Sequence, residues 1–490
     1  MKYLPVIGME VHVELRTESK MFCSCKNGRG LEKEPNINIC PVCTGQPGTL
    51  PTPNRKAIES VQRAGLSLGC SLRLKSKFDR KNYFYPDLPK GYQISQYDEP
   101  FCEKGKLEIR PGKTVDITRI HMEEDTGKST HPLGADYTLV DLNRAGVPLM
   151  ELVTEPDIES ADDARLFCQK LQQILRYIDI SDADMEKGQM RCEVNISVHP
   201  EGTEKLSGTK VEVKNLNSFK SVAGAIDYEI KRQTAALETG EALVQETRGW
   251  DEGRQATVSQ RKKESAHDYR YFPEPDIPPF SFTPEYVEEL RGALPELPDA
   301  KMRRFRESFG LSESDAALLT AEREFAAYYE AVVSELGEKG DAHEADMPEG
   351  KAEKLAANYM ITELRKHFSK TGENISHIRI TPENFAEFIA IVASGKINSS
   401  AAQTVLEEMY KGGDNDPSHV VERLNLAQVS DEGELETIVD TILSANTQSV
   451  TDFKSGKQNA LQFLMGQVMS ATKGKANPKI VSEILTRKLS

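Results

Sequence analysis

The order of apolar and polar residues along the chain predicts two regions of different architecture. Up to about residue 290, short alternating runs are separated by glycine and proline, which is the pattern of strands. Two stretches, 161–178 and 218–239, show the three- and four-residue spacing of amphipathic helices instead. Many strand-like runs with a few long helices favour an α+β fold built on an antiparallel sheet.

After Pro295 the pattern becomes helical throughout. A stretch rich in glycine and acidic residues at 336–350 predicts a loop, and glycine and proline at 411–417 mark a second break. The expected helices are 299–308, 312–335, 351–368, 382–394, 399–411, 418–425, 431–445, 456–471 and 477–488. The chain is therefore expected to form three domains, at 1–292, 293–405 and 406–490.

One expected strand carries an unusual set of side chains. In the alternating run Ile7–Leu15, the side chains of Glu10, His12 and Glu14 fall on one face and apolar side chains on the other. Two carboxylates and an imidazole are costly to bury unless a cation or a substrate pairs with them. The alternative is the solvated outer face of an edge strand, which the segment by itself favours.

Composition limits the classes of protein that fit. A chain of 490 residues is too long for one core, and 38% hydrophobic with 28% charged residues is typical of a globular protein. No apolar run is long enough to span a bilayer and no secretory signal is visible, so we expect no membrane association and a cytoplasmic location.

Charge is unevenly distributed. The net charge of −15 argues against indiscriminate binding to nucleic acid. Residues 451–490, however, carry seven lysines and arginines against two acidic residues, whereas residues 411–450 carry two against eight. A basic terminal segment on an acidic body is typical of a protein that contacts a phosphate backbone at one place only.

Four of the eight cysteines lie close together in the sequence. Cys23 and Cys25 are followed after a loop by Cys40 and Cys43, which can supply four thiolates to one tetrahedral Zn²⁺. Because all four positions of the metal would be filled, such a zinc would be structural. The alternative is four free thiols in a small domain.

Two further segments offer acidic side chains. The run His121–Asp125 follows a strand-like stretch, and Glu151 ends an apolar run. Together with Glu10 and His12, Glu151 and one of Glu124 or Asp125 would form an oxygen-rich site for Mg²⁺ or Mn²⁺, ions that bridge nucleotide phosphates. A surface acidic turn is the alternative for 121–125. The chain has no complete Walker A motif, so ATP would be bound on another scaffold.

The segment Asn82–Gln93 is rich in aromatic residues and has basic residues just before it. Aromatic and basic side chains together can stack and hold the end of a single-stranded nucleic acid. Ordinary packing of aromatic residues in a core or loop explains the segment equally well.

Taken together, these motifs resemble the B-subunit family of the aspartyl/glutamyl-tRNA amidotransferases, from one end of the chain to the other. One position departs, because Glu193-Val194 stands where the family usually has Asp-Ala. The matching segments are Ile7–Leu15, Pro47–Pro51, Tyr83–Gln96, His121–Lys128, Asp141–Asp157, Met190–Ser197, Glu212–Lys220, Asp268–Pro279 and Gly456–Pro478.

The resemblance implies a cradle-shaped α+β domain related to glutamine synthetase, with the zinc-binding insertion at 23–43, then a helical domain and a helical tail that binds tRNA. It implies ATP-dependent amidation of Glu-tRNA(Gln), Asp-tRNA(Asn) or both, through an acyl phosphate. Ammonia would come from a partner amidase A subunit, in a heterotrimer with a small C subunit.

The resemblance also implies roles for individual residues. The Mg²⁺ ligands would be Glu10, His12, Glu124 and Glu151, with Asp125 beside them, and the sequence leaves open which of Glu123, Glu124 and Asp125 contacts the metal. The contacts to the tRNA end or to ATP phosphates would be Tyr83, Lys90 and Arg144, and those to the tRNA body Lys457, Lys473 and Lys475.

Two other functions fit parts of the sequence. A zinc-stabilised tRNA-binding adaptor without catalysis predicts that Glu10→Ala and Glu151→Ala leave amidation intact. A ligase related to glutamine synthetase that acts on a free small molecule leaves the basic segment 451–490 unexplained.

Overall fold

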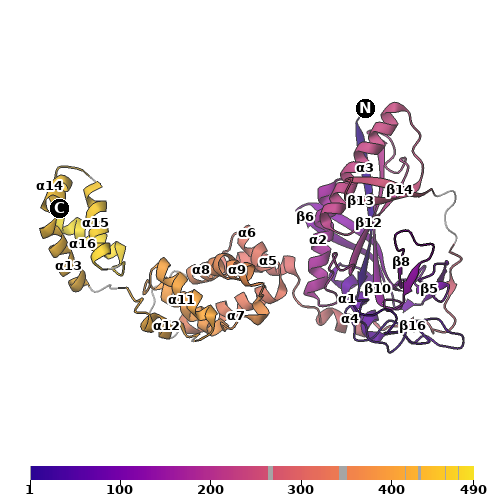
Figure 1. The fold of residues 1–490 in the computed structure, drawn as a ribbon, viewed down its shortest axis with the longest axis horizontal. Coiled ribbons are helices and arrows are strands. Elements are labelled where there is room, and N and C mark those ends of the chain that lie inside the picture. Colours follow the sequence, from indigo (N-terminus) through magenta and orange to yellow (C-terminus); the bar gives the residue numbers. More distant parts are fainter. Residues whose placement is uncertain are drawn as a thin grey trace. The chain divides into compact units, whose positions relative to one another are not determined.

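The computed structural model describes residues 2–262, 269–340, 350–413, 415–428, 432–457, 459–472 and 474–489. The chain divides into two compact units, Met1–Leu297 and Pro298–Ser490. The first unit combines a large sheet with helices, and the described part of the second is helical, which confirms the α+β class (Figure 1). None of the described helices is long and apolar enough to cross a membrane.

The first unit is built on a nine-stranded sheet in the order β14-β13-β12-β11-β1-β10-β7-β6-β2. Its pairs are antiparallel, as predicted, except for β12 and β13, which run parallel. The strands are β1 (Tyr3–Glu14), β2 (Ser71–Leu72), β6 (Cys102–Arg110), β7 (Lys113–Glu124), β10 (Pro148–Thr154), β11 (Met190–Pro200), β12 (Val211–Leu216), β13 (Glu246–Asp251) and β14 (Ala256–Lys262).

Strand β1 is the centre of this sheet, not an edge. It pairs with β11 on one side and β10 on the other, so the interpretation of residues 7–15 as a wet edge strand is wrong. Val11 and Val13 are fully buried, as the alternation predicts. They share the main hydrophobic core with apolar residues of three helices, α1 (Arg55–Ser67), α2 (Ala161–Tyr177) and α3 (Phe219–Thr239).

Each of these helices starts at a polar cap. The side chains of Asn54, Ser160 and Ser218 accept hydrogen bonds from backbone N–H groups in the first turns of α1, α2 and α3. The periodicity of 161–178 and 218–239 predicted α2 and α3, whereas α1 was not predicted. Figure 1 shows α2 and α3 along one side of the large sheet.

Short strands and loops lie toward the other, polar face of the sheet. A three-stranded sheet of β15, β4 and β5 approaches β7 there, since Met122 N–H donates to Gln96 Oε1 and Ile94 N–H donates to Glu124. The remaining elements of the unit are β3 (Lys75–Ser76), β4 (Asp79–Asn82), β5 (Tyr92–Ser95), β8 (Lys128–Thr130), β9 (Leu139–Asp141), β15 (Phe272–Pro273), β16 (Phe280–Ser281) and α4 (Pro284–Gly292).

The second unit consists of helices. They are α5 (Pro298–Phe309), α6 (Glu313–Leu319), α7 (Arg323–Gly340), α8 (Lys351–Tyr359), α9 (Arg365–Thr371), α10 (Pro382–Ala393), α11 (Ser399–Lys411), α12 (Pro417–Arg423), α13 (Glu432–Ala445), α14 (Thr447–Lys454), α15 (Asn459–Ala471) and α16 (Pro478–Leu489). Short π-helical and 3₁₀ segments occur at Met360–Leu364 and Ile375–His377.

Periodicity located most of these helices but not their breaks. The helix expected at 312–335 is two helices, α6 and α7, and both bury residues in the same core, so the apolar spacing continues across the break. Helix α14 was not predicted. The helix expected at 456–471 begins at Asn459 instead. Two hydrophobic cores are separate in this unit: one reaches from Phe305 to Val421, and the other begins at Leu435. The boundary expected at 405/406 stays a prediction.

Candidate active site

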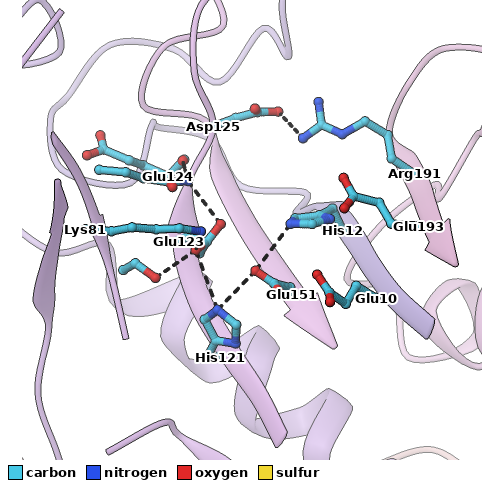
Figure 2. Close-up of polar contacts among 12 residues, drawn as sticks. Glu10, His12, Lys81, His121, Glu123, Glu124, Asp125, Glu151, Arg191 and Glu193 are labelled. Atoms are coloured by element: carbon cyan, nitrogen blue, oxygen red, sulfur yellow. Dashed lines mark hydrogen bonds and ion pairs between the residues drawn. The ribbon is translucent and has the colours of Figure 1, made fainter. Parts of the chain in front are cut away.

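A row of three polar side chains crosses the middle of the sheet. On the paired strands β1, β10 and β7, His12 lies opposite Glu151 and Glu151 lies opposite His121. The Glu151 carboxylate is 3.3 Å from His12 Nε2 and 3.2 Å from His121 Nε2 (Figure 2). All three come from the polar face, which alternation on the central strands places opposite the helices.

Glu123 joins this row from the same strand as His121. Because the two are two residues apart on β7, their side chains share a face, and Glu123 Oε1 is 3.5 Å from His121 Nε2. Lys81 Nζ lies 3.3 Å from Glu123, and Ser95 donates a hydrogen bond of 2.7 Å to the carboxylate. His12, Glu123 and Glu151 each offer a ligand atom within 4.8 Å of the others, which suits one metal ion.

The electrostatics of this row favour ionised carboxylates around charged imidazoles. Burial opposes ionisation of Glu123, but Lys81 and His121 outweigh it and hold the pKa of Glu123 at about 2. Burial likewise opposes protonation of His12, yet the Glu151 carboxylate dominates and raises the pKa of His12 to about 9. Burial acts to raise the pKa of Glu151, but the two imidazoles outweigh it and keep that pKa well below its usual range. A bound cation would supply the positive charge that the protonated imidazoles of His12 and His121 supply without it.

Glu124 and Asp125, expected among the metal ligands, lie outside this group of three. Glu124 forms an ion pair with Lys90 and accepts the Ile94 N–H at 3.0 Å. Figure 2 shows its side chain turned away from His12 and Glu151. Asp125 is bound by Arg191 at 2.9 Å. The interpretation of 121–125 as a surface acidic turn is wrong, because Glu123, Glu124 and Asp125 are all buried.

Glu10 belongs to a second acidic group on the same face. Glu10, Glu193 and Glu212 each place a carboxylate oxygen within 4.8 Å of the others. Lys214 lies 2.8 Å from Glu193 and 3.3 Å from Glu212, and Asn195 donates to Glu10 at 2.8 Å. Burial, with the charges of Glu151 and Glu193, raises the pKa of Glu10. The structure therefore splits the expected metal site into two neighbouring carboxylate groups.

Glu14 continues the face of Glu10 and His12 and is only 2% exposed. Burial raises the pKa of Glu14 to about 8, and the Asp125 charge adds to this shift. Arg191 and Arg144 act in the opposite direction. A carboxyl group with this pKa is mostly protonated at neutral pH and can share its proton with Asp125.

The two acidic groups line a cavity of about 500 Å³ on the polar face. Its wall includes six carboxylates, Glu10, Glu123, Asp125, Glu151, Glu193 and Glu212. Four cationic side chains line it as well, Lys81, Arg119, Arg191 and Lys214. A pocket with charges of both signs can hold a cation together with the anion that the cation binds.

A row of five tyrosines, here called the tyrosine wall, lies along one side of this cavity, and all of them except Tyr85 line it. Tyr85, Tyr83, Tyr269, Tyr271 and Tyr97 follow one another, with ring centroids 6.0, 6.0, 6.1 and 4.4 Å apart. The last pair is stacked at 14°, and the two end rings are 60% and 57% exposed. The expected substrate contact Tyr83 lies in this wall and donates a hydrogen bond to Gln93.

The other two expected substrate contacts are engaged within the protein. Lys90 pairs with Glu124 and lines a smaller cavity of about 180 Å³ beside Cys43. Arg144 donates hydrogen bonds to the backbone oxygens of Thr126 at 3.1 Å and Gly127 at 2.8 Å. Arg144 thus holds the turn that follows Asp125.

The four clustered cysteines meet in space. The Sγ atoms of Cys23, Cys25, Cys40 and Cys43 all lie within 4.8 Å of one another, so this cluster could hold a structural metal. The fully buried Lys20 has its Nζ 3.8 Å from Cys43 Sγ. A hydrogen bond from Cys23, the Cys40 N–H and the Lys20 charge lower the pKa of Cys43 to about 5, which favours the thiolate that a zinc site needs.

The structure describes two of the three tail lysines that were expected to contact tRNA. Lys457 is exposed and pairs with Asp452 at 3.1 Å, and Lys475 is half-buried. Lys473 lies outside the described residues. Part of the basic excess is neutralised, since Arg487 pairs with Glu432.

Several residues of the cavity were not assigned a role of their own from the sequence, although Lys81 is one of the basic residues noted before the aromatic segment and His121 begins the acidic run. They are Lys81, Arg119, His121, Arg191, Glu212 and Lys214. Alternation could have indicated two of them. Arg119 and His121 lie four and two residues before Glu123 on a strand-like run, so their side chains share its face. The others are brought in by strand pairing and by loops far away in the sequence.

Comparison with known proteins shows the family of the chain. Residues 5–288 match the family model described as the GatB/GatE catalytic domain, and residues 341–489 match the one described as the GatB domain. The chain belongs to the GatB family. The conclusion covers both units, since the two matches together include most of the chain.

Three full-length relatives of this GatB-family chain are each named as the B subunit of an aspartyl/glutamyl-tRNA(Asn/Gln) amidotransferase. The protein from Carboxydothermus hydrogenoformans is 48% identical over 495 residues, covering 100% of this chain and 99% of the relative. That from Persephonella marina is 49% identical over 488 residues, 99% of each chain. That from Caldanaerobacter subterraneus subsp. tengcongensis is 49% identical over 493 residues, 100% of each.

Proposed function

We propose that this chain is the subunit of a tRNA-dependent amidotransferase that activates the amino acid. It would use ATP to phosphorylate the side-chain carboxylate of Glu-tRNA(Gln), Asp-tRNA(Asn) or both, and ammonia would then displace the phosphate. The observation that carries the proposal is the buried acidic row on the central strands, together with the end-to-end likeness to proteins of that name.

The chemistry explains why such a site is needed. A carboxylate resists ammonia because its oxygen is a poor leaving group. Transfer of the γ-phosphoryl group makes an acyl phosphate and ADP, and ammonia attacks the carbonyl carbon while the C–O bond to phosphate breaks. Enzymes promote this transfer mainly by positioning the reactants and neutralising charge.

The donor set of His12, Glu123 and Glu151 fits a divalent cation. Carboxylate oxygens are the ligands that Mg²⁺ and Mn²⁺ prefer, and an imidazole is more favourable for Mn²⁺ than for Mg²⁺. A bound ion would neutralise phosphate oxygens. Glu10 and its neighbours Glu193 and Glu212 would be close enough to hold a second cation or to orient the first through water.

Residues of the chain itself would keep this site in its working state. Lys81 lies against Glu123 and is largely buried, so it holds the carboxylate ionised and in place. His121 orients Glu151 and Glu123 from the far end of the row. In this proposal Glu124 and Asp125 act as positioning residues, through Lys90 and Arg191.

The tyrosine wall provides a surface for the unpaired end of the aminoacyl-tRNA. Nucleobases stack on aromatic rings without strong sequence preference. The rings of Tyr97 and Tyr271 line the same cavity as His12 and Glu151. An amino acid attached to the terminal nucleotide would then enter the cavity with its carboxylate toward the acidic row.

The remaining parts of the proposal concern zinc, tRNA and partners. Cys23, Cys25, Cys40 and Cys43 would hold a structural Zn²⁺, and the tail would contact the tRNA body through Lys457, Lys473 and Lys475. Ammonia would be supplied by an amidase A subunit in a heterotrimer with a small C subunit. The expected domains 1–292, 293–405 and 406–490 would form the cradle, the helical domain and the tail.

The direct test is ATP hydrolysis by the assembled complex. Hydrolysis should be stimulated by Glu-tRNA(Gln) and not by Gln-tRNA(Gln), and Glu151→Gln should abolish the stimulation. An adaptor without catalysis predicts full amidation by this variant. A ligase for a free small molecule predicts full activity after deletion of residues 451–490. No stimulation in a complex whose amidase subunit hydrolyses glutamine would refute the proposal.

A further inference from the structure

Three of the four cationic side chains that line the candidate active-site cavity pair with a carboxylate among the described residues, and the fourth does not. Lys81 pairs with Glu123 at 3.3 Å, Arg191 with Asp125 at 2.9 Å, and Lys214 with Glu193 at 2.8 Å. Arg119 forms no ion pair or hydrogen bond through its side chain with any residue that the structure describes. Its Nε atom is shielded from solvent and has no acceptor.

The neighbours of Arg119 on the sheet do not offer it a partner. On β10 the residue directly opposite is the apolar Val153. On β6 the residue directly opposite is Glu103, which instead pairs with Arg73 at 2.8 Å. Arg119 lies in a pocket lined by six carboxylates and is bonded to none of them, and its buried Nε is a donor without an acceptor among the described residues, which costs stability. This arrangement is typical of a residue kept for an anionic ligand.

The position of Arg119 identifies the part of the pocket that it serves. Arg119, His121 and Glu123 occupy alternate positions on β7, so their side chains share the polar face. Successive side chains on one face of a strand are roughly 7 Å apart, and the long arginine side chain can extend over that distance. A group of the size of a phosphate can therefore contact Arg119 and a cation at His12, Glu123 and Glu151 at the same time.

We propose that Arg119 binds the γ-phosphoryl group of ATP during its transfer, an assignment that rests on the proposed function. The guanidinium would donate two hydrogen bonds to equatorial oxygens of that group, the geometry in which arginine binds phosphate best. The bond from the γ-phosphorus to ADP breaks as the bond to the substrate carboxylate forms. Arg119 keeps its protons throughout and stabilises the charge on the oxygens.

The test compares nucleotides that differ by one phosphate. The assembled complex, with Mg²⁺ and without tRNA, is titrated calorimetrically with ADP and with the β,γ-imido analogue of ATP. In Arg119→Gln the affinity for the ATP analogue should fall roughly 30-fold, the effect of removing one bidentate charged interaction, while that for ADP changes less than about 2-fold. Arg119→Lys should recover part of the loss.

Arg63 offers a matched control. Its Nε is also buried without an acceptor, but it lies on α1, outside the cavity. Arg63→Gln should therefore leave both nucleotide affinities at the parent values. Thermal unfolding of each variant complex establishes that the compared proteins are folded.

Three results would overturn the inference. Unchanged affinities in Arg119→Gln would show that Arg119 does not contact the nucleotide. An equal loss for ADP and the ATP analogue would place the contact away from the γ-phosphate. An increased KM for aminoacyl-tRNA with unchanged nucleotide affinity would assign Arg119 to the amino-acid carboxylate. Failure of the proposed function is separate, because it would appear in the parent complex as hydrolysis that Glu-tRNA(Gln) does not stimulate.

Discussion

His12 and Glu151 face each other across the two central strands of the sheet, with Nε2 and Oε2 3.3 Å apart. Glu151 is also 3.2 Å from His121, so one buried carboxylate is shared by two imidazoles. The register of β1 against β10 sets this contact, and the pairing of β10 with β7 sets the other. Strand pairing therefore brings His12, Glu151 and His121 into one compact group. This group can release the protons of its imidazoles when it binds a cation.

Removal of the Glu151 charge should lower the pKa of His12. Burial disfavours the charged imidazole, and the Glu151 carboxylate is the main reason that the pKa of His12 rises to about 9. In metal-free Glu151→Gln, NMR titration of labelled histidines should show His12 deprotonating at a pH at least one unit lower. Glu155→Gln is the control, since Glu155 is an exposed carboxylate just beyond the same strand. An unchanged His12 titration in Glu151→Gln would contradict the electrostatic account.

Glu123 and Glu124 should differ in their effect on metal binding. Glu123 belongs to the group with His12 and Glu151, whereas Glu124 is engaged by Lys90. Titration with Mn²⁺ followed by electron paramagnetic resonance should show an affinity loss of roughly 10- to 100-fold in Glu123→Gln. Glu124→Gln should keep an affinity close to that of the parent protein, because the Glu124 carboxylate is directed to Lys90 and not to the metal-binding group. The reverse order would restore the ligand set expected from the sequence.

The cysteine cluster should contain zinc in the purified protein. We expect one zinc per chain by elemental analysis, and its near-complete loss in Cys40→Ser. Chelation of the metal should lower the midpoint of thermal unfolding, because a structural zinc site contributes to folding. Cys70→Ser replaces a buried cysteine outside the cluster and should retain the zinc. Equal zinc content in both variants would refute the site.

Glu229 should make the stability of the first unit depend on acid pH. Its carboxylate is fully buried, and burial opposes its ionisation, but Arg232, Thr257 and Gln233 outweigh burial and lower its pKa below 4.5. The folded protein then holds this proton less tightly than the unfolded chain. The stabilisation is therefore present above about pH 4.5 and is lost as the pH falls through the lower folded-state pKa.

The matched variant for this effect is Glu229→Gln. At neutral pH it should lower the free energy of unfolding by roughly 2 kcal/mol, since a charged acceptor of several hydrogen bonds is replaced by a neutral one. Between pH 6 and pH 3 the difference from the parent should shrink, as measured by urea unfolding. A constant difference over this range would show that Glu229 is not the titrating group.

The tail lysines should act on tRNA through charge alone. Replacing Lys457 and Lys475 by glutamate should weaken tRNA binding at low salt. The slope of log affinity against log salt concentration should become less steep by about 1 for each phosphate that the protein no longer neutralises. Lys2→Glu alters a lysine at the other end of the chain, which pairs with Glu201, and should leave the slope unchanged. Equal slopes in the tail variant and the parent would place the tRNA contact elsewhere.

Local patterns in the sequence were sufficient to predict much of the fold. Alternation located β1 and separated the buried Val11 and Val13 from the polar Glu10 and His12. Helical spacing and capping residues located α2, α3 and most helices of the second unit. These features depend on near neighbours in the chain, and so a sequence contains them directly. The break between α6 and α7 was not visible, because both helices face one core.

Spacing likewise brought the four cysteines together correctly, since they are confined to one short segment. The choice among Glu123, Glu124 and Asp125 was different, because adjacent residues of a strand point to opposite faces. Strand register puts Glu123 with His121 and Glu151, and loop contacts turn Glu124 toward Lys90 and Asp125 toward Arg191.

The sequence determined the class of fold, the strand at residues 7–15 with its polar face, and the family to which the chain belongs, but not that this strand is the centre of the sheet. Tertiary structure alone decided that this face is buried, that Glu10 and Glu151 fall into separate carboxylate groups, and that Arg119 has no partner among the described residues. The reason is physical: pairing partners, burial and charge balance arise from segments far apart in the chain, and none of them is a property of local spacing.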